Sequence, residues 1–294
     1  MQTLEEFNPK LKYRELGLGI EHFVRNRNKE FLRNILDEAY NLGITHFDIV
    51  YNYPHFFDVF KEFIKYYNNE ISFTLHIGQV YNENKDISQK SRSLTAIKSN
   101  MEYVYNVLDL DYIDTGILQY ITSSDDWKVI KEKRILKYGN DLKDTGKLKS
   151  FGISSHRPEL LLEIIKDNEF DVIMFPINFV TGHLQGTKEL INECKSQSIK
   201  IMGIKTLLHG KAFTTKKIKY PKLMSCFSEH SVKLESPAKP YQCFNYALDQ
   251  GVDQIIFGIK NIYQLQENVE SYKTNKEMKD YSKIEKQFIE GEIG

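Results

Sequence analysis

The sequence is poor in cysteine, and the cysteines it has form no pattern. Cys194, Cys226 and Cys243 are odd in number, and no Cys-x-x-Cys pair occurs. Such cysteines fit free thiols in a reducing compartment, not a disulfide framework or an iron–sulfur site. An excess of charge is missing too, since 40 basic residues balance 40 acidic ones. Bulk electrostatics therefore gives no reason to expect a nucleic-acid or membrane-surface partner.

Long apolar runs are also absent. The sequence has no stretch of about 18 apolar residues, and its first residues, MQTLEEFNPKLKYREL, contain no signal-peptide core. We therefore expect a cytoplasmic protein. What is present is material for a sizeable core, because 41% of the residues are hydrophobic and there are 18 Phe and 18 Tyr. A chain of 294 residues suits two average domains or one α/β barrel of about 250 residues.

Short β-rich runs alternate with stretches of helical periodicity. Residues 31–42, for example, repeat apolar side chains at the spacing of a helix with one buried face, and Gly43 then supplies a C-terminal stop. The expected strands are 16–20, 44–48, 71–77, 112–118, 148–154, 171–175, 199–204 and 253–257. The expected helices are 31–42, 56–67, 93–108, a longer region from Trp127 to Gly146, 159–166, 188–196, 242–250, 265–272 and a charged tail helix. Residues 207–239 are expected to form an inserted loop with some helix.

Eight strand–helix units without an obvious break predict one α/β domain over residues 1–294, folded as a (β/α)8 TIM barrel. In that fold the active groups come from the C-terminal ends of the strands. A doubly wound sheet is the rival architecture, and it calls for a Gly-x-Gly-x-x-Gly turn after the first strand. Gly17 and Gly19 are present, but His22 occupies the position of the third glycine. The barrel is therefore favoured.

The segment from Ile44 to Tyr53 starts as a β-branched apolar run and ends in polar residues. This pattern is typical of a buried strand that delivers side chains to the top of a barrel. Asp48 lies at the strand end, and Tyr53 follows five residues later. A carboxylate beneath a phenol can hold a cation that makes the phenol a better proton donor. On this segment alone, a helix-capping Asp and a Tyr packed over the barrel rim explain the pattern equally well.

Four blocks of sequence together resemble the aldo/keto reductase family. They are YRELGLG at residues 13–19, GITHFD at 43–48 with Tyr53, GKLKSFGIS at 146–154, and Gly258 followed by Glu267 and Asn268. The blocks occur in the family's order and at roughly its spacing. The resemblance implies a (β/α)8 barrel that binds NADP(H) without a Rossmann domain and transfers a hydride to or from a carbonyl carbon. The partner it implies is a small carbonyl or alcohol substrate.

The resemblance also implies a catalytic set of an Asp, a Tyr proton donor, a Lys and a His. Asp48 and Tyr53 match the first two, whereas His76 stands at the position of the Lys and Gln119 at that of the His. Histidine supports a phenol only while it is protonated, and glutamine can orient a carbonyl but cannot exchange a proton. Because a positioned acid–base group is worth about 10² to 10⁴ in rate, we expect a loss of about tenfold to several thousandfold.

The positions that the resemblance assigns to the cofactor are kept in part. Ser155 replaces an Asn, and Met174 a Gln, that contact the nicotinamide carboxamide in the family. Lys205 is expected to face the pyrophosphate and Lys260 the 2′-phosphate. The full expected cofactor set is Gly19, Ser154, Ser155, Asn178, Lys205, Gly258, Lys260, Gln264, Glu267 and Asn268.

Three functions stay open at the level of the sequence. The first is an NADP(H)-dependent oxidoreductase of a small, sugar-like carbonyl or alcohol, with Tyr53 as proton donor. The second is a pseudo-reductase that serves as a cofactor-binding or regulatory protein, and the third is a barrel reused for non-redox chemistry, since fold does not fix function. Retention of Asp48 and Tyr53 favours the first. No motif indicates an oligomeric state.

A metal site is not expected. His55, His156, His183 and His209 all follow strand ends, but the sequence has no His-x-His or His-x-x-x-His pair. These histidines are predicted to be loop residues.

Overall fold

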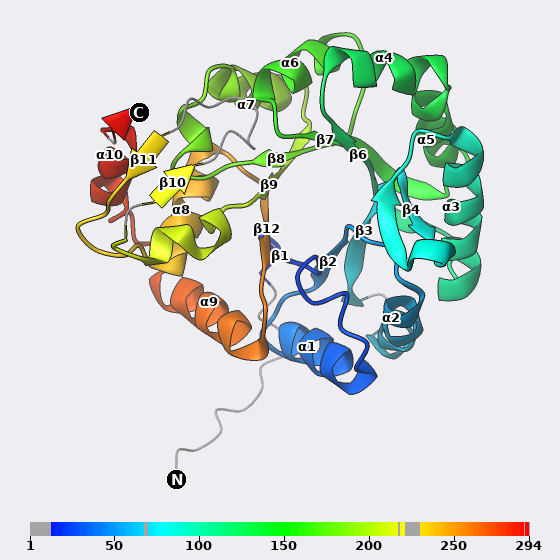
Figure 1. Cartoon of the computed structure of the whole chain (residues 1–294), viewed down its shortest axis with the longest axis horizontal. Coiled ribbons are helices and arrows are strands. Elements are labelled where there is room, and N and C mark those ends of the chain that lie inside the picture. The colour runs from blue at the N-terminus through cyan, green and yellow to red at the C-terminus, as the bar shows by residue number, and fades with distance from the viewer. Residues whose placement is uncertain (1–12, 68–69, 217, 221–229, 291, 294) are drawn as a thin grey trace.

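The barrel predicted from the sequence is present in the computed structural model. The model describes residues 13–67, 70–216, 218–220, 230–290 and 292–293. Eight parallel strands close into a barrel in the order β1-β12-β9-β8-β7-β6-β3-β2, and helices surround it (Figure 1). The fold class, a (β/α)8 barrel, is therefore confirmed. The assignment of residues 1–294 to one domain stays a prediction.

The barrel strands lie close to the predicted runs. They are β1 (Leu16–Gly19), β2 (His46–Ile49), β3 (Ser72–Ile77), β6 (Ile113–Ile121), β7 (Leu148–Ser155), β8 (Val172–Pro176), β9 (Lys200–Ile204) and β12 (Gln254–Gly258). The helices are α1 (Lys29–Asn41), α2 (Pro54–Tyr67), α3 (Leu94–Leu108), α4 (Ser124–Glu132), α5 (Ile135–Asp144), α6 (Pro158–Lys166), α7 (Thr187–Ser196), α8 (Pro240–Gln250), α9 (Ile262–Asn275) and α10 (Ser282–Ile289).

The longer helical region expected between Trp127 and Gly146 is present and consists of two helices. They are α4 and α5, and they are separate because Arg134 between them adopts a left-handed conformation with φ 58°. A left-handed residue cannot continue a right-handed helix. The helical region also begins at Ser124, before Trp127, where the Ser123 side chain accepts a hydrogen bond from the amide of Asp126 and caps α4.

Along strand β2, successive side chains point alternately toward the helix layer and into the barrel interior. Phe47 packs against Phe60 and Phe63 of α2, with ring centroids 6.2 and 5.1 Å apart. Successive strand residues point to opposite faces, so His46 and Asp48 face the other way, into the barrel. The same parity on β3 places Thr74 and His76 inside.

The interior of the barrel is apolar on one side and hydrogen-bonded on the other. A separate cluster of buried apolar residues comes from the strands β6, β8, β9 and β12: Ile117, Val172, Met174, Met202 and Ile256. On β2, the ring of His46 lies 2.9 Å from Ser72 Oγ and 3.0 Å from Thr74 Oγ1. Complete burial, with a smaller effect of Lys200, lowers the pKa of His46 to about 4. His46 is therefore a neutral, hydrogen-bonded core residue at neutral pH.

Two segments that follow barrel strands contain strands that the sequence did not predict. The stretch after β3 is an antiparallel hairpin of β4 (Gln79–Asn82) and β5 (Ile87–Lys90) around the short helix η2 (Glu83–Lys85). Within the insertion 207–239, the short helix η4 (Leu208–Phe213) is followed by β10 (Ile218–Tyr220) and β11 (His230–Val232). These two strands pair with each other, and β11 pairs with β13 (Glu292–Ile293). A further short helix, η3 (Thr181–His183), follows β8.

The cysteines Cys194 and Cys243 are free and buried, and burial raises the pKa of Cys194 to about 12. Cys226 lies outside the described residues. In the described part of the chain no helix is both long and apolar enough to cross a membrane. The cytoplasmic location stays a prediction.

Candidate active site

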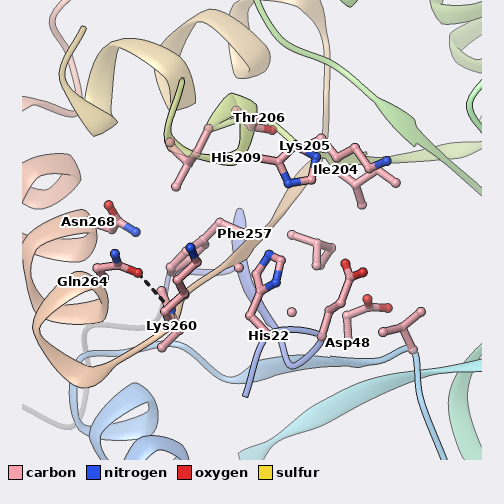
Figure 2. Close-up of a pocket in the computed structure, with 18 of the residues that line it drawn as sticks. His22, Asp48, Ile204, Lys205, Thr206, His209, Phe257, Lys260, Gln264 and Asn268 are labelled. Atoms are coloured by element: carbon pink, nitrogen blue, oxygen red, sulfur yellow. Dashed lines mark hydrogen bonds between the residues drawn. The ribbon is translucent and has the colours of Figure 1, made fainter. Parts of the chain in front are cut away.

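A cavity of about 730 Å³ opens at the C-terminal ends of the barrel strands. Figure 2 shows Asp48 and the α9 residues Gln264 and Asn268 on opposite sides of it, with His22 between them and Lys205 on a further side, near Thr206 and His209. Eleven of the residues predicted from the sequence line this cavity: Gly19, Asp48, His76, Gln119, Ser154, Lys205, Gly258, Lys260, Gln264, Glu267 and Asn268. Because they come from strands far apart in the chain, the barrel closure is what brings them together.

A buried carboxylate–imidazole pair forms part of the cavity wall. His76 Nε2 lies 2.9 Å from Asp48 Oδ1, and the two side chains are only 5% and 8% exposed. A carboxylate accepts hydrogen bonds, so the Nε2–H of His76 donates to Asp48. In neutral His76 this assignment leaves Nδ1 with a lone pair. That Nδ1 is buried and has no hydrogen-bond partner among the described residues.

Gln119 lines the cavity from β6, the strand next to β3. Its Oε1 is also buried without a partner among the described residues. The Arg92 guanidinium donates to the backbone oxygens of Gln119 and Tyr120 at 2.7 and 3.0 Å. Arg92 is in turn paired with Asp126, at 2.8 Å from Nε to Oδ1. This pair fixes the end of β6 from which Gln119 projects.

The Arg92–Asp126 pair remains ionised at neutral pH. Burial alone would raise the pKa of Asp126, but hydrogen bonds from Arg92 and Lys90 bring it well below its usual range.

The two tyrosines of the β2–α2 loop differ in position. Tyr53 is 4% exposed, its ring contacts those of Tyr51, His55 and Tyr81, and it is not among the residues that line the cavity. Tyr51 does line the cavity, and its hydroxyl donates to Glu21 Oε1 at 3.3 Å. Burial, and then Glu21, raise the pKa of Tyr51. The role of Tyr53 as proton donor stays a prediction.

Two unpaired polar groups lie where a phosphate could be held. Lys205, which has a left-handed backbone with φ 56°, lines the cavity, and in the described residues its ammonium has no hydrogen bond or ion pair. Burial lowers the pKa of Lys205, and the charge of Glu21 opposes that shift. The neighbouring Thr206 Oγ1 is buried and likewise lacks a partner among the residues described. An ammonium and a hydroxyl are suitable donors for phosphate oxygens.

The far end of the cavity is built on the first turns of α9. Asn261 caps this helix by accepting from the amide of Gln264 at 3.0 Å. Gln264 Oε1 accepts from the amide of Lys260 at 2.9 Å, which Figure 2 marks with a dashed line. Glu267 and Asn268 complete this polar end.

Two predicted cofactor residues lie outside the cavity lining. The Ser155 hydroxyl donates to the carbonyl of Ile121 at 2.6 Å and accepts from the amide of Arg157 at 3.1 Å. The side-chain Nδ2 of Asn178 donates to the backbone carbonyl of Lys205 at 3.1 Å. Both side chains thus stabilise the loops around the cavity, and their cofactor contacts stay predictions.

Several cavity residues were not predicted from the sequence. His22 and His209 contact each other edge to face, with ring centroids 6.4 Å apart, across the cavity. A Cβ at Gly258 would lie 2.9 Å from His22 Cδ2, so the lack of a side chain at this glycine leaves room for the His22 ring. His156 stacks on Tyr120 at 5.7 Å, and burial, with Lys205, lowers its pKa to about 4.

The sequence signal for these residues was weak. In the sequence, His22 stands out only as the residue in place of a third glycine, and His156 and His209 only as residues after strand ends. Among the described residues, no group of three or more His, Cys, Asp or Glu is placed to hold a metal ion.

The chain matches known proteins in sequence. The sequence model of the aldo/keto reductase family matches residues 15–288. A curated relative, the uncharacterized oxidoreductase YqkF of Bacillus subtilis, is 28% identical over 162 residues, which are 54% of this chain and 51% of that protein. The match thus spans about half the length of that relative.

Solved structures show the same fold. The holo form of the aldo-keto reductase AKR11C1 from Bacillus halodurans aligns with a TM-score of 0.72 at 20% identity, covering 95% of this chain and 93% of that one. The apo form of the same protein aligns with a TM-score of 0.64 at 18% identity, over 95% and 92% of the two chains.

Proposed function

This chain belongs to the aldo/keto reductase family, and from that premise we propose that it is an NADP(H)-dependent oxidoreductase of a small carbonyl compound or its alcohol. The family implies oxidoreduction with a nicotinamide cofactor. One observation carries the proposal: a single cavity joins the buried Asp48–His76 pair to an unpaired Lys205 ammonium and to the polar turn of α9. A catalytic end and a phosphate-holding end in one cavity are what such an enzyme requires.

The residues present fit the cofactor. The cavity volume of about 730 Å³ lies in the usual range of ligand sites, and the orphaned Thr206 hydroxyl is a buried donor in need of a ligand acceptor. Lys205 and Thr206 would hold phosphate oxygens, and Lys260 and Gln264 would lie toward the 2′-phosphate. Glu267 and Asn268 would contact the adenine. When bound, the nicotinamide supplies or accepts the hydride.

The substrate end suits a small hydroxylated molecule. Tyr51, Tyr120 and His156 line the cavity near the strand ends and offer hydrogen-bonding groups on aromatic rings. Aromatic faces with a few polar atoms are typical of small-molecule sites. This composition supports a sugar-like carbonyl or alcohol as the substrate class.

The family pattern assigns the proton exchange to Tyr53, and the variant Tyr53→Phe tests that assignment. Loss of turnover with unchanged NADPH binding would support it, because the substitution removes only the hydroxyl.

A fluorescence titration tests the proposed function. NADPH or NADH would be added to the purified protein while the emission of Trp127, the one tryptophan of the chain, and of the tyrosines is followed. A panel of aldehydes and sugars would then be offered with NADPH. We expect saturable binding and substrate-dependent NADPH oxidation. Binding without any turnover would favour a cofactor-binding pseudo-reductase, and absence of binding would refute the proposal.

A matched variant makes the titration sharper. Lys205→Met keeps the length of the side chain but removes its charge. Because a hydrogen bond to a charged group contributes about 1.5–3 kcal/mol, NADPH affinity should fall about tenfold or more. An unchanged affinity would contradict the placement of the phosphates at Lys205.

A further inference from the structure

We propose that His76 itself exchanges the proton with the substrate oxygen, through its unpaired Nδ1, and that Asp48 holds it in the tautomer this requires. The inference rests on the proposed oxidoreductase function and identifies the group that handles the proton in it. It gives His76 a role that differs from support of a neighbouring phenol.

The two ring nitrogens of His76 differ in their surroundings. Nε2 is occupied by Asp48 Oδ1 at 2.9 Å, while Nδ1 is buried with no partner in the described part of the chain. Buried polar atoms are nearly always hydrogen-bonded, so an unpaired one on a side chain that lines a cavity points to a ligand that completes it. His76 lines this cavity.

The Asp48 carboxylate sets the orientation and the tautomer of His76. An imidazole whose N–H is held by a buried carboxylate has a fixed ring orientation and a fixed tautomer, and its other nitrogen is free to act as a base. The carboxylate also stabilises the imidazolium that forms when the base takes a proton. Asp48 and His76 come from neighbouring strands β2 and β3, so the rigid barrel holds the pair.

The other tyrosines and histidines near the cavity are less suitably placed for proton exchange. Tyr53 is buried outside the cavity lining. The Tyr51 hydroxyl lines the cavity but already donates to Glu21, and a carboxylate partner makes a phenol a weaker acid. His22 and His209 contact each other, and His156 stacks on Tyr120.

The chemistry balances in both directions. In alcohol oxidation, the Nδ1 lone pair takes the hydroxyl proton, and the O–H electron pair becomes the second carbon–oxygen bond. As this bond forms, the C–H bond breaks, and its hydrogen leaves with both electrons for the oxidised nicotinamide. In carbonyl reduction, the imidazolium gives its Nδ1 proton to the oxygen while carbon receives a hydride from the reduced nicotinamide. The Nε2 proton stays on the hydrogen bond to Asp48 throughout.

Gln119 would complete the arrangement without exchanging a proton. It projects from β6 beside β3, its side-chain oxygen is unpaired among the described residues, and Arg92 fixes its backbone. An amide can orient the substrate oxygen toward His76 but cannot titrate.

Single-turnover kinetics on four variants tests the inference. His76→Gln, Asp48→Asn and Tyr53→Phe would each be saturated with NADPH and mixed with an aldehyde that the wild type reduces. His183→Gln is the matched control, because His183 is outside the cavity lining and half-exposed. We expect His76→Gln to keep NADPH binding and to lose about 10² to 10⁴ of the reduction rate. Added imidazole should restore part of that rate, and Tyr53→Phe should lose less than His76→Gln.

A ranking in which Tyr53→Phe loses more than His76→Gln would overturn the inference while leaving the reductase function intact. Wild-type protein that neither binds nor oxidises NADPH would instead refute the proposed function.

An NMR measurement tests the tautomer without any turnover. Protein labelled with ¹⁵N-histidine would be recorded at neutral pH, with His76→Gln used to assign the signals. We expect His76 to carry its proton on Nε2 and to have a bare Nδ1. In Asp48→Asn the amide group can donate to Nε2, so the proton should move to Nδ1. A wild-type His76 protonated on Nδ1 alone would overturn the inference.

Discussion

Protonation of His46 is expected to weaken the fold in mild acid. The ring is fully buried between Ser72 and Thr74, and its pKa is lowered by burial, and by Lys200, from 6.5 to about 4. In the unfolded chain the same ring titrates near 6.5. Between these two values the unfolded chain binds a proton that the folded chain does not, so the stability from His46 is complete above about pH 6.5 and is lost as the pH falls.

The size of the effect follows from the lowered pKa. Each pH unit below about 6.5 costs about 1.4 kcal/mol, so about 2 kcal/mol should be lost by about pH 5 and about 3 kcal/mol by about pH 4. Urea unfolding, followed by circular dichroism at about pH 7.5, 6 and 5, measures this loss. The variant His46→Gln keeps hydrogen-bonding groups near Ser72 and Thr74 but cannot titrate. If it showed the same pH dependence as the wild type, the assignment of the loss to His46 would be refuted.

Three further predictions address the end of β6 that carries Gln119, the cofactor preference and the barrel packing. Arg92→Met leaves Asp126 without its main partner, so we expect the free energy of unfolding in urea to fall by about 3 kcal/mol. Turnover should also be slower, because Gln119 is no longer fixed. An unchanged free energy of unfolding together with an unchanged turnover rate would contradict the role of this pair. Lys260→Met should weaken NADPH binding about tenfold and leave NADH binding nearly unchanged in the fluorescence titration, since only NADPH carries a 2′-phosphate; equal losses for both cofactors would contradict that contact. Gly152→Ala would place a Cβ 2.1 Å from the carbonyl oxygen of Val172, so about 3 kcal/mol of destabilisation is expected in thermal unfolding. A variant as stable as the wild type would show that β7 and β8 can move apart at no cost in free energy.

The barrel could be predicted from the sequence because its strands and helices differ in period. Buried strands carry continuous apolar runs, and helices such as α1 repeat apolar residues on one face. The hairpin β4–β5 was missed because its strands, QVYN and ISQK, are short and mostly polar. The break at Arg134 was missed because a left-handed conformation at an arginine leaves no signal in composition.

Residues that line the candidate cavity could be predicted only where spacing along the chain determines position. Asp48, His76 and Gln119 each lie at or near a strand end, so resemblance located them, and the closed barrel brings them to one cavity. Whether Tyr51 or Tyr53 reaches that cavity depends on the conformation of the short loop before α2, which spacing does not determine. The contact between His22 and His209 joins loops that are far apart in sequence, and no local pattern reports it.

Closure of the barrel also has a consequence for biosynthesis. Strand β1 pairs with β12, and the side chain of Gln254 donates to the carbonyl of Arg14 across 240 positions of the chain. Strand pairings between residues so far apart in sequence form slowly, because the entropy cost of closing a long loop comes before any stabilising contact is made. On the ribosome, β1 and β9 therefore keep an open edge until β12 has emerged, and open strand edges promote aggregation. The nascent chain should consequently depend on chaperones until β12 has been made.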